Sequence, residues 1–212
     1  MKTDDLIEQL SADVRPVRPL AAPALRALVW LALAVPPVLI VVAVHGVQKS
    51  PAMVLGDGRA VIEALAMIAT AVTAGIAAFA SEVPGAGRRW LWLPLVPLAV
   101  WVASVGESCL ADFQTAGAAA LAIGSDPCLV PTFFASIVPA AVMFAMIRRG
   151  APLAPVTTLA LGGLAVAALV NFGMMLFHVG DVSLSVLVWH GGAIALVAAA
   201  AGLSGPRMLR WR

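Results

Sequence analysis

Charged side chains are scarce in this chain of 212 residues, of which only 11% are Asp, Glu, Lys or Arg and 62% are hydrophobic. A water-soluble domain carries about a quarter of its residues as charges, and none has a mean hydropathy of +1.00. The composition therefore predicts an integral membrane protein. The formal net charge is only +2. It is spread over the ends of loops and forms no phosphate-binding face, which excludes a nucleic-acid-binding protein.

Motifs for metal binding and catalysis are also missing. The chain has two cysteines and three histidines, without a Cys-x-x-Cys or a His-x-x-x-His spacing. No nucleophile stands with a base and no carboxylates are paired, so we expect no enzyme. A small multi-pass transporter or channel is the alternative function. It would need ionisable groups or broken helices around a midplane site, and the deep spans offer only Asn171, His190 and several prolines.

Six long stretches are almost free of charge, and each approaches the roughly 20 residues that a helix needs to cross the bilayer. The second contains Glu63 in its first turn, and the third is short. The sequence thus predicts an all-α bundle of six transmembrane helices over residues 27–206. The predicted spans are 27–47, 60–80, 90–106, 128–147, 153–177 and 182–203.

Basic residues predict the orientation, because Lys and Arg are retained on the cytoplasmic side during insertion. With both termini cytoplasmic, only Lys49 and Arg59 fall outside. The other 11 basic residues are then inside: Lys2, Arg15, Arg18, Arg26, Arg88, Arg89, Arg148, Arg149, Arg207, Arg210 and Arg212. Residues 207–212 form a basic cytoplasmic tail. We expect Trp30, Trp90 and Trp92 to anchor the bundle at the inner boundary, as aromatic belts do.

Residues 1–26 form a cytoplasmic arm that begins with a predicted amphipathic helix over residues 3–14. Carboxylates in its first turn suit the helix dipole. Apolar residues recur at helical spacing along one stripe. A helix of twelve residues is only marginally stable alone in water, so another surface must pack against this apolar stripe. The polar face is mostly acidic, which makes anionic lipid a poor cover. A protein groove with an apolar floor and a basic rim fits better, and folding back onto the inner loops is the alternative.

Both cysteines and all three histidines fall toward the outer side of the predicted topology. Three interpretations stay open for Cys109 and Cys128: a disulfide, a soft-metal site, and inert packing. A disulfide would close a loop of about 20 residues and stabilise the fold by roughly 3 kcal/mol. A transiently bound metal would use both thiolates with His178, Asp126 or Asp181. In the spans, we expect Asn171 to bridge two helices by a hydrogen bond, and His190 to be a hydrogen-bonded packing residue or a switch.

Several segments together resemble one family. They are the opening Met1-Lys2-Thr3-Asp4-Asp5-Leu6-Ile7, Val14-Arg15-Pro16-Val17, Arg148-Arg149-Gly150-Ala151-Pro152 with Pro155, a Gly-rich fifth span, Trp189-His190-Gly191, and a closing Gly-Pro-Arg-Met-Leu-Arg-Trp from Gly205. In order and spacing they are similar to the NrsF-like membrane anti-sigma factors. The resemblance implies a six-span protein of the bacterial inner membrane whose cytoplasmic arm binds an extracytoplasmic-function sigma factor and keeps it from RNA polymerase. The residues expected to bind the sigma factor are Asp4, Asp5, Leu6, Ile7, Leu10 and Val14.

The resemblance also implies that outward-facing cysteines read metal or oxidative stress. One expected cysteine corresponds to Cys128, but the other should follow the fifth span, where His178-Val179-Gly180-Asp181 stands without one. Either Cys109 replaces it or sensing differs here. The candidate sensing residues are Cys109, Cys128, His178, Asp181 and His190, and the candidate metal ligands are Cys109, Cys128 and His178.

Overall fold

The computed structural model describes residues 3–12, 19–47, 50–87, 89–118, 129–150, 152–176 and 183–209. Within these ranges the chain is helical and has no strand. The helices are α1 (Thr3–Ala12), α2 (Pro23–His45), α3 (Pro51–Gly56), α4 (Gly58–Ala80), α5 (Arg89–Trp92), α6 (Leu95–Ala116), α7 (Leu129–Arg149), α8 (Pro155–Met175), α9 (Ser183–Val186), the π-helical turn η2 (Leu187–Gly191) and α10 (Gly192–Met208).

Six helical segments are long and apolar enough to cross a membrane, which confirms the predicted number of spans. Five of them lie within a few residues of the prediction. The third is longer than predicted, because helix continues beyond Gly106 to Ala116. It ends at Gly117, whose φ of 59° is in the left-handed region that favours glycine. Part of the expected outer loop is therefore an extension of α6.

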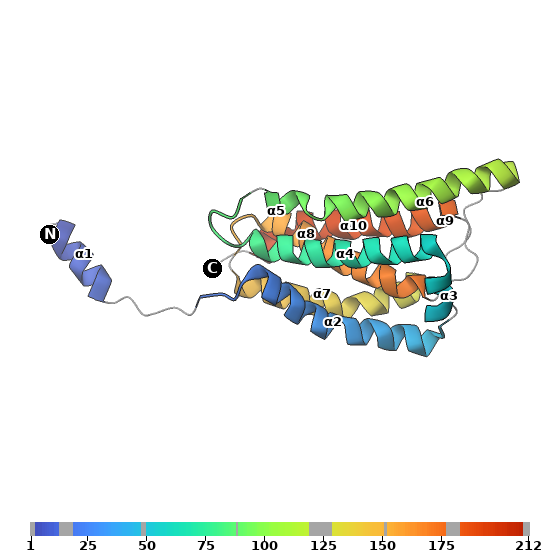
Figure 1. Cartoon of the computed structure of the whole chain (residues 1–212). Coiled ribbons are helices and arrows are strands. Elements are labelled where there is room, and N and C mark those ends of the chain that lie inside the picture. The colour runs from blue at the N-terminus through green and yellow to red at the C-terminus, as the bar shows by residue number, and fades with distance from the viewer. Residues whose placement is uncertain are drawn as a thin grey trace.

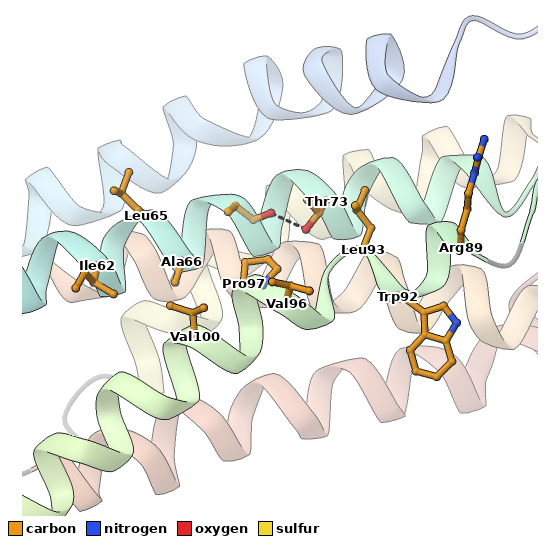
Figure 2. Close-up of a pocket in the computed structure, with 11 residues that line it drawn as sticks. Ile62, Leu65, Ala66, Thr73, Arg89, Trp92, Leu93, Val96, Pro97 and Val100 are labelled. Atoms are coloured by element: carbon orange, nitrogen blue, oxygen red, sulfur yellow. Dashed lines mark hydrogen bonds between the residues drawn. The ribbon is translucent and has the colours of Figure 1, made fainter.

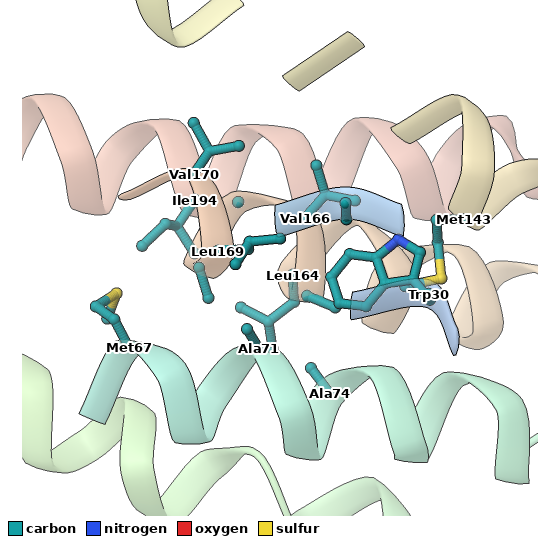
Figure 3. Close-up of a cluster of buried hydrophobic side chains, with 14 of the residues drawn as sticks. Trp30, Met67, Ala71, Ala74, Met143, Leu164, Val166, Leu169, Val170 and Ile194 are labelled. Carbon is teal, nitrogen blue, oxygen red and sulfur yellow. The ribbon is translucent and has the colours of Figure 1, made fainter. Parts of the chain in front are cut away.

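The six spans form one bundle with α8 inside it (Figure 1). Helices α2, α4, α7 and α10 all contact α8, and most of its side chains are buried. The core is built largely of Ala, Val and Leu, and it joins side chains of different spans, among them Met67 and Ala71 of α4, Leu164 of α8 and Ile194 of α10 (Figure 3). The small residues allow the backbones to approach closely, as packing inside a bilayer requires.

Trp30 does not lie in an interfacial belt, so that expectation was wrong. Its side chain is fully buried in the core, and its indole Nε1 donates a hydrogen bond to the carbonyl oxygen of Pro139 at 3.1 Å (Figure 3). Small residues of α4 pack against the indole: a Cβ on Gly75 would make an ordinary van der Waals contact with its ring, at 3.6 Å. Trp92, in contrast, is largely exposed.

At the end of the bundle nearest the arm, each of the six spans either begins or ends (Figure 1). Here α2 and α8 begin, α4, α7 and α10 end, and the short helix α5 leads into α6. The turn after α4 and the turn after α7 both lie at this end. Both turns contain glycine and proline, which favour a tight connection between helices, and Gly85 adopts a positive φ of 78°.

Candidate functional site

The helix of the arm presents its apolar stripe to solvent. Every residue of α1 is exposed, including Leu6 at 40%, Ile7 at 59% and Leu10 at 63%. Asp4 and Asp5 occupy its first turn as expected, whereas Val14 lies outside the described residues. Figure 1 shows α1 apart from the bundle, so the turns at the near end of the bundle do not cover the stripe. Exposed aliphatic side chains on one helix face are a surface suited to a groove in another protein.

A buried ion pair lies where the arm enters the bundle. Arg26, in the first turns of α2, donates from Nη1 to Oε2 of Glu82, and both side chains are almost completely buried. Nη2 of Arg26 donates to the carbonyl oxygen of Met146 at 2.8 Å. The guanidinium also lies 4.3 Å from the centre of the Phe79 ring. Arg26 thereby joins the start of α2 to the ends of α4 and α7.

The Glu82 carboxylate occupies a space that exists only because residue 150 is glycine. A Cβ at Gly150 would lie 1.7 Å from Oε2 of Glu82. The other oxygen, Oε1, is buried and has no hydrogen-bond partner among the described residues. Beside the pair, the Ser81 and Thr158 hydroxyls are hydrogen-bonded at 2.7 Å, which ties the same turn to α8. The turn after α4 is thus held against α2, α7 and α8.

Burial raises the pKa of Glu82 from 4.5 to about 7, while the hydrogen bond and charge of Arg26 act in the opposite direction. Desolvation outweighs the partner because two buried charges lose their hydration and one carboxylate oxygen gains no bond in return. Glu82 can consequently change its charge near neutral pH. A group with that property beside the junction of arm and bundle is suited to a switch.

Sequence reasoning missed this pair. It counted Arg26 as one of the residues that set the orientation, and it assigned no role to Glu82. The two residues are 56 positions apart, and no periodicity links them. One signal was present: an acidic residue, Glu82, directly follows an apolar span in a segment otherwise marked by arginines. Such a residue needs a cationic partner if the turn is buried.

At the opposite end of the bundle, polar side chains join α4 to the extension of α6. Arg59 Nη2 lies 3.6 Å from Oε1 of Glu107, and Arg59 Nη1 donates to the Ser108 hydroxyl at 2.8 Å. The Ser104 hydroxyl donates to Glu63 at 3.1 Å. Cys109 follows these residues on α6 and is half-buried. Because Arg59 and Glu107 are well exposed, their pair contributes little stability and is easily rearranged.

His190 and Asn171 meet inside the bundle. His190 lies in η2, and its Nδ1 donates a hydrogen bond to Oδ1 of Asn171 on α8. The Asn171 amide in turn donates to the carbonyl oxygen of Ala167 at 3.0 Å. The expectation that Asn171 bridges two helices is therefore confirmed. A π-helical turn within a span is a local departure from regular helix, of the kind often found at functional sites.

The remaining candidate sensing residues cannot be placed beside these. Cys128, His178 and Asp181 lie outside the described residues, and so does Asp126. Within the described ranges, no three His, Cys, Asp or Glu side chains come together as metal ligands. The disulfide and metal interpretations of Cys109 and Cys128 stay hypotheses.

One family matches almost the whole chain. The model of the NrsF family, described as negative regulator of sigma F, matches residues 10–211. The match covers all six spans and the residues of the buried pair, and it begins within α1 at Leu10. Neither a curated protein nor a solved structure matches the chain. A match over this length is decisive, and the chain belongs to the NrsF family of negative regulators of a sigma factor.

Proposed function

We propose that this protein is a membrane-bound anti-sigma factor that holds an extracytoplasmic-function sigma factor through its N-terminal arm and releases it on an envelope signal such as metal or oxidative stress. It would act at the bacterial inner membrane with both termini in the cytoplasm. The single observation that carries the proposal is the uncovered apolar stripe of α1 in a chain whose family regulates a sigma factor negatively.

The chemistry of α1 defines the surface that it would bind. Leu6, Ile7 and Leu10 need an apolar groove, and the carboxylates of Asp4, Asp5 and Glu8 need basic residues at its rim. Each aliphatic anchor would contribute roughly 1.5–3 kcal/mol before the cost of ordering is subtracted. A segment that orders on binding can also be released by a modest change at its attachment to the bundle.

We place the change at the attachment of the arm in the Arg26–Glu82 pair. In the proposed mechanism, one arrangement of α2, α4 and α7 buries both charges, and a second separates them and alters how the arm leaves the membrane. Such an equilibrium would be biased at the outer end, at Cys109, Cys128, His178, Asp181 or His190, and read at the inner end. The easily rearranged contacts of Arg59 with Glu107 and Ser108 support an input at that end.

Binding by the arm is tested with the full-length chain in detergent and the sigma factor encoded beside its gene. The double variant Leu6→Asp with Leu10→Asp should weaken binding by roughly 100-fold, since two anchors of at least about 1.5 kcal/mol are lost. The matched control is Gln9→Asp with Ala12→Asp, which adds the same charge to α1 without replacing a residue of the apolar stripe. The control should change the affinity by less than about threefold. Equal losses in the two double variants would refute the helix-in-groove proposal.

A further inference from the structure

An apolar groove runs along the outside of the bundle between α4 and the α5–α6 segment. Its volume is about 780 Å³, and its lining is almost entirely aliphatic and aromatic (Figure 2). Ile62 and Val100 lie at one end, and Arg89 and Trp92 lie at the other (Figure 2). The hydroxyl of Thr73 is already satisfied by the carbonyl oxygen of Ala69 at 2.6 Å. The groove therefore has an apolar floor and a cation at one end.

The wall of the groove that carries Arg89 is long enough for an acyl chain. On the α5–α6 segment the lining runs from Arg89 to Val100, and at 1.5 Å per residue this distance is about 16 Å. Half of a hydrocarbon core of about 30 Å, the depth of one leaflet, is about 15 Å. Arg89 is the first residue of the third candidate span, the place in a span where basic side chains meet lipid headgroups. This charge at one end of an apolar groove complements the anionic head of a lipid.

We propose that this groove binds one anionic phospholipid from the leaflet at the Arg89 end. An acyl chain lies along Leu65, Ala69 and Val96, and the lipid phosphate contacts the Arg89 guanidinium. That side chain is exposed, and its guanidinium lies 5.7 Å from the ring centre of Trp90. A planar guanidinium binds phosphate oxygens in pairs. Its positive charge favours a lipid whose headgroup has a net negative charge over a zwitterionic lipid with the same phosphate. The site is separate from the sigma-factor-binding arm and does not depend on the proposed function.

Native mass spectrometry of the full-length protein tests the proposal. The protein is reconstituted in equal amounts of phosphatidylglycerol and phosphatidylcholine, then extracted in mild detergent. We expect one retained phosphatidylglycerol, favoured about tenfold over phosphatidylcholine, as a charge-assisted contact allows. Arg89→Gln should abolish this preference but keep a lipid. Ala69→Phe fills the floor of the groove and should remove the retained lipid of either type.

Two matched controls isolate the site. Arg148 is exposed and lies over an aromatic ring, 5.8 Å from the centre of Phe144, outside the groove. Arg148→Gln therefore removes a comparable charge, and Ala195→Phe adds a comparable side chain to the exposed face of α10. Both should retain phosphatidylglycerol as the wild type does.

Equal losses in Arg89→Gln and Arg148→Gln would overturn the proposal. A second outcome would also overturn it: the wild type forms a dimer and Ala69→Phe dissociates this dimer, because a second copy of the chain would then occupy the groove. If Ala69→Phe fails to fold, the comparison of the two arginine variants still decides.

Discussion

Arg26 and Glu82 are costly residues to bury, and their surroundings compensate only in part. Both lose hydration, one carboxylate oxygen has no partner among the described residues, and only Arg26 gains further contacts, with Met146 and Phe79. Hydrophobic residues of similar size often stabilise a protein as well as such a pair. The pair is better explained by the specific arrangement that it imposes on α2, α4 and α7 than by stability.

Gly150 and Glu82 are expected to be strongly coupled. Gly150→Ala should lower the free energy of unfolding by about 1–3 kcal/mol, because the new Cβ overlaps the Glu82 carboxylate. In a Glu82→Ala background the same change should cost less than about 1 kcal/mol, since the overlapping group is gone. Unfolding of the four proteins in detergent measures the coupling. Additive effects would mean that Glu82 does not occupy the space above Gly150.

The raised pKa of Glu82 predicts a pH dependence of stability. Its ordinary value of 4.5 rises to about 7 in the bundle, so the folded state binds more protons than the unfolded state between these values. The resulting stability is fully present below pH 4.5 and is lost as pH rises through about 7. We expect the melting temperature in detergent to fall between pH 5 and pH 8, by an amount equivalent to roughly 1–3 kcal/mol.

Two variants assign this pH dependence to its source. Glu82→Gln cannot titrate and should flatten the profile, whereas Glu107→Gln removes an exposed carboxylate and should leave the profile unchanged. The same slope in the wild type and in Glu82→Gln would assign the dependence to other groups, such as the histidines.

Among the helices, the sequence predicted the features that depend on local composition. Each span is visible as an apolar run, and α1 follows from its own spacing and first-turn carboxylates. The extension of α6 beyond Gly106 was not predicted, because Glu107 and Asp112 interrupt the apolar run there. Which helices meet was not predictable. Trp30 is buried against Gly75 and Pro139, which belong to other spans, and the central position of α8 depends on the whole bundle.

The contact between α8 and α10 relies on glycine at specific positions. A Cβ at Gly205 would lie 2.5 Å from the carbonyl oxygen of Pro155, whose backbone cannot easily move. Gly205→Ala should therefore destabilise the protein by about 1–3 kcal/mol. Gly192→Ala, on the same helix and with open space around it, should be neutral or stabilise by up to about 1 kcal/mol through helix propensity. Thermal unfolding of the two variants compares them directly, and equal behaviour would contradict the close packing of α10 on α8.

At the scale of the whole molecule, the charges divide between the two ends of the bundle. Among the described basic residues, only Arg59 lies at the end with Cys109. The others in the bundle lie at the end where α2 begins: Arg26, Arg89, Arg148, Arg149 and Arg207. This distribution predicts that the second end faces the cytoplasm. The Arg26–Glu82 pair and the arm would then lie on the side where a sigma factor is found.

Cysteine labelling in cells tests this orientation. In a Cys109→Ser, Cys128→Ser background, Glu107→Cys should react with a membrane-impermeant maleimide once the outer membrane is permeabilised, because residue 107 is exposed at the outer end of α6. Gly87→Cys, exposed in the turn after α4, should react only after the inner membrane is broken. Each variant is the control for the other. The reverse pattern would place α1 on the far side of the membrane from any sigma factor, and the proposed function would fail with it.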